Sequence, residues 1–127
     1  MTSDSNKVAL VTGGSRGLGK DMAIQLAKKH FNVILTYQSS EAAANEVVAS
    51  IRAMGQKAAA LPLDVAKSSA YDAFVGQVQA TLSGEFGTDR IHALVNNAGT
   101  GLYASFDSTT EAQFDEMVNI HLKADQR

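Results

Sequence analysis

The chain of 127 residues contains no cysteine, which excludes disulfide bonds and thiolate metal sites. This absence is compatible with a reducing compartment. Neither sign of charge dominates, because 11 Lys and Arg residues are balanced by 13 Asp and Glu residues. The sequence also lacks a basic patch and basic residues interleaved with aromatic ones, so nucleic acid is not an expected partner.

No apolar run approaches the roughly 18 residues that a membrane-spanning helix needs. Residues 1–6 are polar, and the apolar run after them is too short for a secretory signal peptide. We therefore expect a cytoplasmic protein without membrane contact. We also expect one domain over residues 1–127, with a flexible N-terminus at residues 1–6.

A glycine-rich turn is the most informative segment that is present. Gly13, Gly17 and Gly19 lie between an apolar run at residues 8–11 and a helical pattern at residues 18–30. Glycine lets a backbone approach a phosphate closely, and a helix N-terminus offers free N–H groups and a positive dipole end. The spacing is neither Gly-x-Gly-x-x-Gly nor a P-loop, so a tight turn without a ligand stays an alternative. The order of strand, glycine turn and helix favours a nucleotide pyrophosphate.

Strand-like and helix-like segments alternate along the rest of the chain. Further strands are predicted at residues 31–37, 57–63 and 91–95, and helices at residues 41–54 and 71–82. Strands separated by helices form right-handed parallel βαβ units. We therefore expect an α/β protein with a doubly wound, Rossmann-type parallel sheet of about four strands and helices on both faces.

A last helix is predicted near the end of the sequence. Residues 108–111 have capping-box spacing, ahead of Phe114, Met117 and Val118 on one helix face. Asn119 lies inside this predicted helix. Because the fourth strand of a doubly wound sheet normally has a further neighbour, we expect a bare edge there. A bare edge predicts weak stability or self-association.

Four blocks of the sequence resemble the short-chain dehydrogenase/reductases. They are Thr-Gly-Gly-Ser-Arg-Gly-Leu-Gly at residues 12–19, Asp64-Val65, Asn-Asn-Ala-Gly at residues 96–99, and Asn119. The resemblance covers essentially the whole chain, but only about the first half of a typical member. Within this family, the sequence is similar to the 3-oxoacyl-carrier-protein reductases and related carbonyl reductases. The resemblance implies an oxidoreductase that moves hydride between a nicotinamide dinucleotide and a small carbonyl or alcohol substrate.

The resemblance also assigns roles to individual residues. The candidate cofactor-binding residues come from the resemblance and, for Tyr37, Ser39 and Ser40, from the end of the second predicted strand. The full set is Thr12, Gly13, Ser15, Arg16, Gly17, Leu18, Gly19, Tyr37, Ser39, Ser40, Asp64, Val65, Asn96, Ala98 and Gly99. The backbone of residues 15–18 would hold the pyrophosphate. Asp64 and the backbone of Val65 would read the adenine ring, with a helix N-cap as the plainer role for Asp64. Asn96 and Gly99 would lie along the cofactor ribose, with a simple turn as the alternative.

One catalytic role follows from the same resemblance. In the family, the residue matching Asn119 kinks its helix and holds a water in the proton relay, whereas the plain alternative is an exposed helix Asn. The three histidines, His30, His92 and His121, have no metal-ligand spacing. We expect no metal site.

The end of the second strand predicts the choice of cofactor. An enzyme that prefers NAD usually presents a carboxylate about 20 residues past the glycine turn. Here residues 36–40 contain no acid before Glu41. Arg16 can make paired hydrogen bonds to a 2′-phosphate, and Ser39 and Ser40 offer hydroxyl donors. We therefore predict a preference for NADP(H), with a solvated surface arginine as the alternative role of Arg16.

The catalytic Ser and Tyr-x-x-x-Lys of the family have no match in these residues. Tyr37, Tyr71 and Tyr103 are followed four positions later by Glu, Val and Asp. Without a nearby lysine, a tyrosine with a pKa of about 10 is a poor proton donor at neutral pH. We expect no turnover from residues 1–127 alone. A truncated reductase, an expressed fragment, a nucleotide-binding module without catalysis, and a part that needs a partner chain all stay open.

Overall fold

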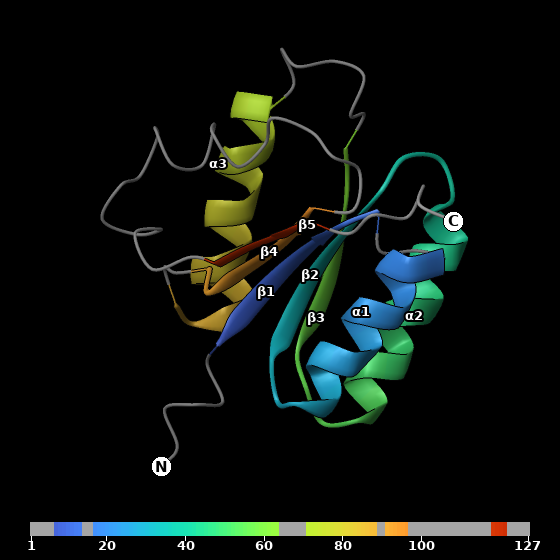
Figure 1. Cartoon of the computed structure of the whole chain (residues 1–127). Helices are drawn as coiled ribbons and strands as arrows, with labels where there is room; N and C mark the ends of the chain where they lie inside the picture. The colour runs from blue at the N-terminus through green and yellow to red at the C-terminus, as the bar shows by residue number, and fades with distance from the viewer. Residues whose placement is uncertain (1–6, 14–16, 64–70, 89–90, 97–117, 122–127) are drawn as a thin grey trace.

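The computed structural model describes residues 7–13, 17–63, 71–88, 91–96 and 118–121. The strands are β1 (Val8–Thr12), β2 (Asn32–Tyr37), β3 (Ala58–Pro62), β4 (Ala93–Asn96) and β5 (Val118–His121). The helices are α1 (Gly17–Lys28), α2 (Glu41–Ala53) and α3 (Tyr71–Thr81), which continues into the π-helical turn η3 (Leu82–Phe86). The strands form one parallel sheet in the order β3-β2-β1-β4-β5 (Figure 1).

The sheet has helices on both faces, as the sequence predicts. Helices α1 and α2 lie together on one face, and α3 covers the other (Figure 1). Neighbouring residues of the central strands point to opposite faces, because side chains alternate along a strand. Leu10 and Ile34 belong to the core under α3, whereas Val11, Val33 and Leu35 belong to the core under α1 and α2. The doubly wound fold is confirmed.

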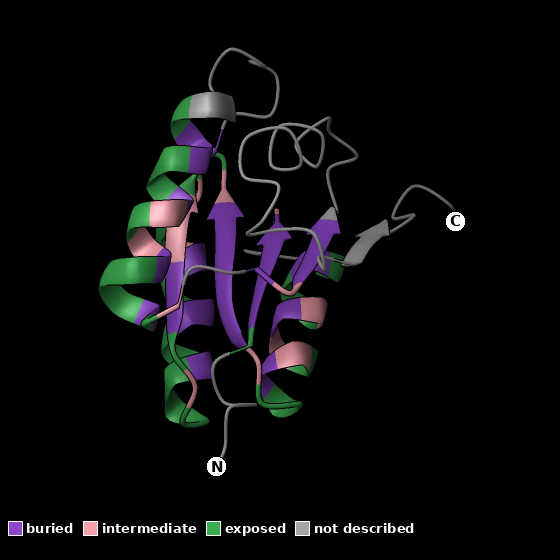
Figure 2. Cartoon of the chain, turned by 90° about the vertical axis from the view of Figure 1, so that its left-hand side faces the viewer, coloured by how far each residue is buried: buried purple, intermediate pink, exposed green. Residues whose placement is uncertain are grey.

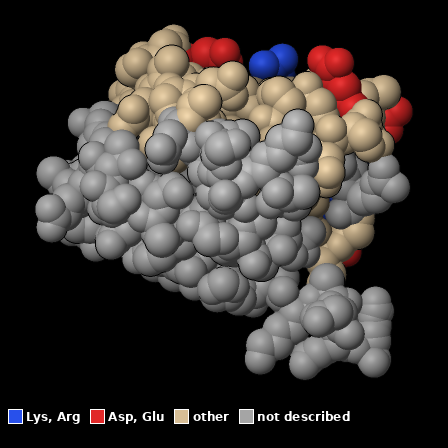
Figure 3. All heavy atoms as spheres, turned by 90° about the horizontal axis from the view of Figure 1, so that it is seen from above, with Lys and Arg blue, Asp and Glu red and all other residues tan. Residues whose placement is uncertain are grey.

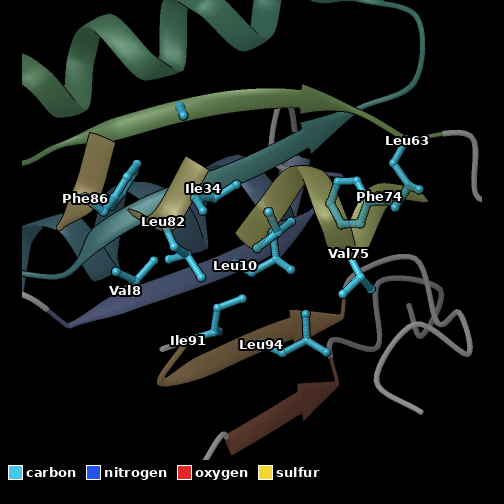
Figure 4. Close-up of a cluster of buried hydrophobic side chains, with 12 residues drawn as sticks. Val8, Leu10, Ile34, Leu63, Phe74, Val75, Leu82, Phe86, Ile91 and Leu94 are labelled. Atoms are coloured by element: carbon cyan, nitrogen blue, oxygen red, sulfur yellow. The ribbon is translucent and has the colours of Figure 1, made fainter. Parts of the chain in front are cut away.

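The two cores explain why β1 and β2 contain the continuous apolar runs Val8–Val11 and Val33–Leu35. Both central strands are buried along their lengths apart from the half-buried Tyr37, and they appear as a purple centre between green outer helix faces (Figure 2). On the α3 side, Phe74, Val75 and Leu82 meet Leu10 and Leu94 of the sheet (Figure 4). A strand buried on both faces has no reason to alternate polar and apolar residues.

The helix predicted around Val118 and Asn119 is wrong, because these residues lie in β5. Strand β5 pairs in parallel with β4, with Ala93 opposite Val118 and Asn96 opposite His121. Val118 and Ile120 alternate with two polar residues, which suits a strand. The edge of β4 also offers backbone N–H and C=O groups that a strand can satisfy. The sheet therefore has a fifth strand beside the four predicted ones, and β4 has no bare edge.

Strand β3 forms one edge of the sheet and is partly shielded there. The N–H of Val33 donates to Lys57 O, and the N–H of Leu63 donates to Tyr37 O. Since backbone groups alternate in direction along a strand, those of Ala58, Ala60 and Pro62 point away from β2. Arg52 Nη2 donates to Ala58 O at 3.0 Å, and Pro62 has no N–H. Both features make this edge a poor template for another strand.

No described helix has both the length and the hydropathy that crossing a membrane requires. Seen from above, acidic and basic side chains lie side by side along the visible rim of described residues (Figure 3). Among the described residues on that rim, charge of one sign does not gather.

Candidate functional site

The strand order places the topological switch point of the sheet at the carboxyl end of β1. From β1 the chain runs to β2 and β3 on one side of the sheet, and then crosses to β4 on the other side. The connections therefore diverge at the end of β1, and open α/β sheets bind ligands outside such a switch point. The predicted glycine turn begins at this point, since Gly13 directly follows β1.

Hydrogen bonds to side chains or from side chains add to the main-chain pairing at the end of β1. Thr12 is fully buried, lies opposite Asn96, and its Oγ1 donates to Val95 O at 3.4 Å. On the other side, the N–H of Gly13 donates to Thr36 Oγ1 at 2.8 Å. Gly13 has a φ of 67°, which lies in the left-handed region that glycine adopts without strain. The chain therefore turns out of the sheet at a fixed place.

The first turn of α1 forms the far side of the turn. Gly17 opens the helix with a φ of 63°, and a Cβ built there would meet nothing within 4 Å. The space beside its Cα is therefore open. Gly19 is buried, so α1 packs closely on the sheet, whereas Leu18 is 45% exposed. The first turn of α1 carries no acidic side chain, so no side chain of this turn offsets the positive end of the helix dipole. These features suit an anion.

The end of β2 lies beside the end of β1 and leads into α2. Tyr37 is half-buried and packs against the core under α1 and α2, and its carbonyl accepts the N–H of Leu63 at 2.9 Å. Ser39 is exposed and Ser40 is half-buried. The first carboxylate after β2 is that of Glu41, which is exposed in the first turn of α2.

The structure brings part of the predicted site together. Six of its residues end or follow parallel strands at their carboxyl ends: Thr12, Gly13, Tyr37, Ser39, Ser40 and Asn96. Three more open α1: Gly17, Leu18 and Gly19. Ser15, Arg16, Asp64, Val65, Ala98 and Gly99 lie outside the described residues.

Asn119 does not lie where the prediction put it. It lies in β5 opposite Leu94, so Asn119 itself is in a strand and not in the helix that the predicted relay role assumed. Among the described residues, no group of three or more His, Asp or Glu side chains could hold a metal ion.

Sequence reasoning missed Thr36, whose hydroxyl accepts the first amide of the glycine turn. The signal was a hydroxyl residue directly after the apolar run Val-Ile-Leu of the strand Asn-Val-Ile-Leu-Thr-Tyr. Its side chain is only 2% exposed, and a buried hydroxyl needs a hydrogen-bond partner.

The model of the family described as short chain dehydrogenase matches residues 7–125. The chain belongs to this family. Short-chain dehydrogenases are oxidoreductases that bind nicotinamide dinucleotides, and the family resemblance that the sequence suggested is confirmed.

Two relatives show what this short-chain dehydrogenase is similar to. It is 35% identical over 120 residues to the hydroxynaphthalene reductase-like protein Arp2 of Metarhizium guizhouense, a match that covers 94% of this chain and 43% of that protein. It is 36% identical over 118 residues to the 3-oxoacyl-acyl-carrier-protein reductase FabG of Staphylococcus epidermidis, covering 93% of this chain and 46% of that protein. The chain thus spans less than half the length of these relatives.

Solved structures show the same fold. A short chain dehydrogenase from Burkholderia cenocepacia in complex with NADP is 42% identical with a TM-score of 0.64, covering 74% of this chain and 36% of that one. The angucycline C-6 ketoreductase LanV with bound NADP is 33% identical with a TM-score of 0.69, covering 74% of this chain and 37% of that one.

Proposed function

We propose that this chain is the cofactor-binding part of an NADP(H)-dependent reductase. The reductase would transfer hydride between the nicotinamide and a small carbonyl or alcohol substrate. One observation carries the proposal: a glycine turn with left-handed Gly13 and Gly17 joins β1 to α1 at the switch point of the sheet. In this proposal residues 1–127 form one domain, which acts in the cytoplasm.

The described residues fit the pyrophosphate of such a cofactor. The open space beside Gly17 allows a phosphate to approach the backbone, and the first N–H groups of α1 point out of the helix unpaired by its own carbonyls. When bound, the nicotinamide supplies the hydride. The chain itself holds the pyrophosphate through the backbone of residues 15–18, and it orients the nicotinamide ring by fixing the turn.

The preference for NADP(H) follows from the end of β2. A carboxylate there would bind the ribose 2′-hydroxyl and repel a 2′-phosphate, but the first acid is Glu41 in α2. Ser39 and Ser40, beside Tyr37, offer hydroxyl groups at this place instead. Arg16 supplies the positive charge. Two similar structures were solved with NADP, which supports the same choice.

The remaining site assignments belong to the same proposal. Asp64 and the backbone of Val65 read the adenine ring, and Asn96, Ala98 and Gly99 lie along the ribose. Asn96 is well placed for this, because it ends β4 directly opposite Thr12 of β1.

A second function is favoured by one feature of the sequence. None of the three tyrosines is followed four positions later by lysine. A chain with this cofactor site and no proton donor would bind the dinucleotide without turning it over. Incubation with NADPH and a panel of small ketones separates the two functions, since a reductase consumes NADPH and a binding module does not.

The NADP(H) preference is tested by titrating the purified chain with NADPH and NADH while monitoring nicotinamide fluorescence. We expect NADPH to bind more tightly. Charge-assisted hydrogen bonds contribute about 1.5–3 kcal/mol, so Arg16→Ala should weaken NADPH binding about 10- to 100-fold and leave NADH nearly unchanged. Lys28→Ala is the matched control, because Lys28 is an exposed cation in the last turn of α1, at the opposite end of the helix. Tighter binding of NADH to the unaltered chain would contradict the preference.

A further inference from the structure

The contact between Gly13 and Thr36 has an unusual position in the sheet. The N–H of Gly13 donates to Thr36 Oγ1 at 2.8 Å, and the two residues are 23 positions apart in the sequence. The Thr36 side chain is 2% exposed. The contact therefore joins the first residue after β1 to a buried hydroxyl near the end of β2.

The strand register shows what this hydrogen bond replaces. Pairing between β1 and β2 ends with Val11 opposite Leu35. The N–H of Asn32 donates to Lys7 O at the start of the pair, so every second residue of β2 bonds with β1 through its main chain. A ladder continued by one step would take the N–H of Gly13 to the main-chain carbonyl of Thr36. At this place the Thr36 hydroxyl accepts the N–H.

This exchange of acceptor lets β1 leave the sheet without losing its last hydrogen bond. Gly13 has a φ of 67°, far from the extended backbone of a strand. A main-chain acceptor would hold Gly13 in the plane of the sheet, whereas a side-chain oxygen reaches it after the chain has turned. The bond to Thr36 thus fixes the direction in which the glycine turn departs.

On the opposite side, β1 pairs with β4 through its main chain as far as Thr12, which lies opposite Asn96. Thr12 Oγ1 donates to Val95 O at 3.4 Å, a long hydrogen bond, whereas the contact to Thr36 is 2.8 Å. Of these two side-chain contacts, the shorter one therefore comes from β2, and it holds Gly13, the first residue of the turn. Thr36 also directly precedes Tyr37 and lies three positions before Ser39. It therefore links the glycine turn to the segment that we propose faces the 2′-phosphate of the cofactor ribose.

We propose that Thr36 is a positioning residue of the cofactor site, whose hydroxyl accepts the Gly13 N–H and so aims the glycine turn at the pyrophosphate. The inference rests on the proposed function, because it assumes that this turn binds a dinucleotide. Thr36 does not touch the cofactor. Its effect is transmitted through the backbone at Gly13.

Two substitutions separate the hydroxyl from the shape of the side chain. Thr36→Val keeps the volume and the branched Cβ but removes the acceptor, whereas Thr36→Ser keeps the hydroxyl. Thr81→Val is the matched control, since Thr81 Oγ1 donates to Gln77 O at 2.9 Å in an exposed part of α3. Each variant is titrated with NADPH and NADH well below its unfolding temperature, so that loss of folded protein does not enter the affinity.

The expected result is a loss common to both cofactors. Thr36→Val should weaken NADPH and NADH binding by the same factor, about tenfold, because both carry the same pyrophosphate. Thr36→Ser should restore most of the affinity, and Thr81→Val should leave it unchanged. Arg16→Ala, in contrast, changes the ratio of the two affinities. If the unaltered chain binds NADPH and Thr36→Val binds it equally well, the positioning role is overturned while the proposed function stands.

Hydrogen exchange of the cofactor-free chain gives a second measurement. The Gly13 amide should exchange about tenfold faster in Thr36→Val than in the unaltered chain, while the amide of Leu10 in the middle of β1 stays equally protected. Equal exchange at Gly13 in both proteins would overturn the inference without any ligand. Failure of the unaltered chain to bind either dinucleotide would overturn the proposed function, and the cofactor role of Thr36 with it.

Discussion

Replacing Gly17 with alanine tests whether the glycine turn holds a phosphate or is only a tight turn. Gly17 and Gly87 are a matched pair, with φ angles of 63° and 69° and nothing within 4 Å of an added Cβ at either position. Gly87 follows η3, whereas Gly17 opens α1 at the proposed site. The two substitutions therefore impose the same backbone strain, and they differ in what lies beside the new methyl group.

The strain is the same for both variants and can be estimated. A left-handed backbone costs an L-residue about 1–2 kcal/mol. Part of this is offset, because alanine restricts the unfolded chain by about 0.4–1 kcal/mol more than glycine. Each variant should lose about 1 kcal/mol of stability, which lowers the unfolding temperature by about 4 °C in a domain of this size.

Binding of NADPH should respond differently. The methyl group of Gly17→Ala enters the open space assigned to the pyrophosphate, and losing a charge-assisted contact of about 1.5–3 kcal/mol weakens binding about 10- to 100-fold. Gly87→Ala should bind like the unaltered chain. Gly17→Asn relieves part of the strain, because asparagine tolerates the left-handed region, but its side chain still fills the space. It should therefore regain stability without regaining affinity.

Fluorescence titration and thermal unfolding of the same preparations measure both effects. Equal NADPH affinities for Gly17→Ala and Gly87→Ala, with the expected loss of stability in each, would refute the assignment of the phosphate to this turn. The glycine would then serve the backbone conformation alone.

Two further predictions concern the sheet. Pro62→Val restores an outward N–H on the β3 edge, so sedimentation velocity should show a shift toward larger species. Unchanged sedimentation would show that Pro62 does not shield this edge. Asn32→Leu should lower the free energy of unfolding, measured by urea titration, by about 2 kcal/mol. The reason is that the buried Asn32 Oδ1 accepts hydrogen bonds from both Gln56 Nε2 and the Lys57 N–H at 3.0 Å. A change below about 0.5 kcal/mol would contradict the role of these hydrogen bonds.

The elements that were predicted correctly have strong local signals. Strand β1 is a short run of apolar residues between polar segments, and α2 places Ala44, Val47 and Ile51 on one buried face. Gly55, with a φ of 91°, follows the end of α2, where glycine in the left-handed region commonly ends a helix. Strand β3 has a weaker local signal, because alanine favours helix over strand, and Pro62 stands at its end, where a strand tolerates proline.

The elements that were missed depend on contacts between distant parts of the chain. Strand β5 has four residues, too few for its alternating pattern to outweigh the helical signal around Phe114 and Met117. What decides its structure is the pairing with β4, which local sequence does not encode. The hydroxyl of Thr36 is a similar case. The sequence shows a polar residue in a buried strand, but the donor is an amide 23 positions away.

The described residues divide the proposed site into a rigid part and a variable part. Thr12, Gly13 and Thr36 belong to the ends of buried strands or are hydrogen-bonded to them, so their positions are set by the same packing that stabilises the sheet. Ser39 and Ser40 follow β2 and contribute little to either core. Substitutions of these serines should therefore change the choice between NADP and NAD with little cost in stability. Substitutions at the strand ends should weaken both cofactors together, since they act on the pyrophosphate that the two share.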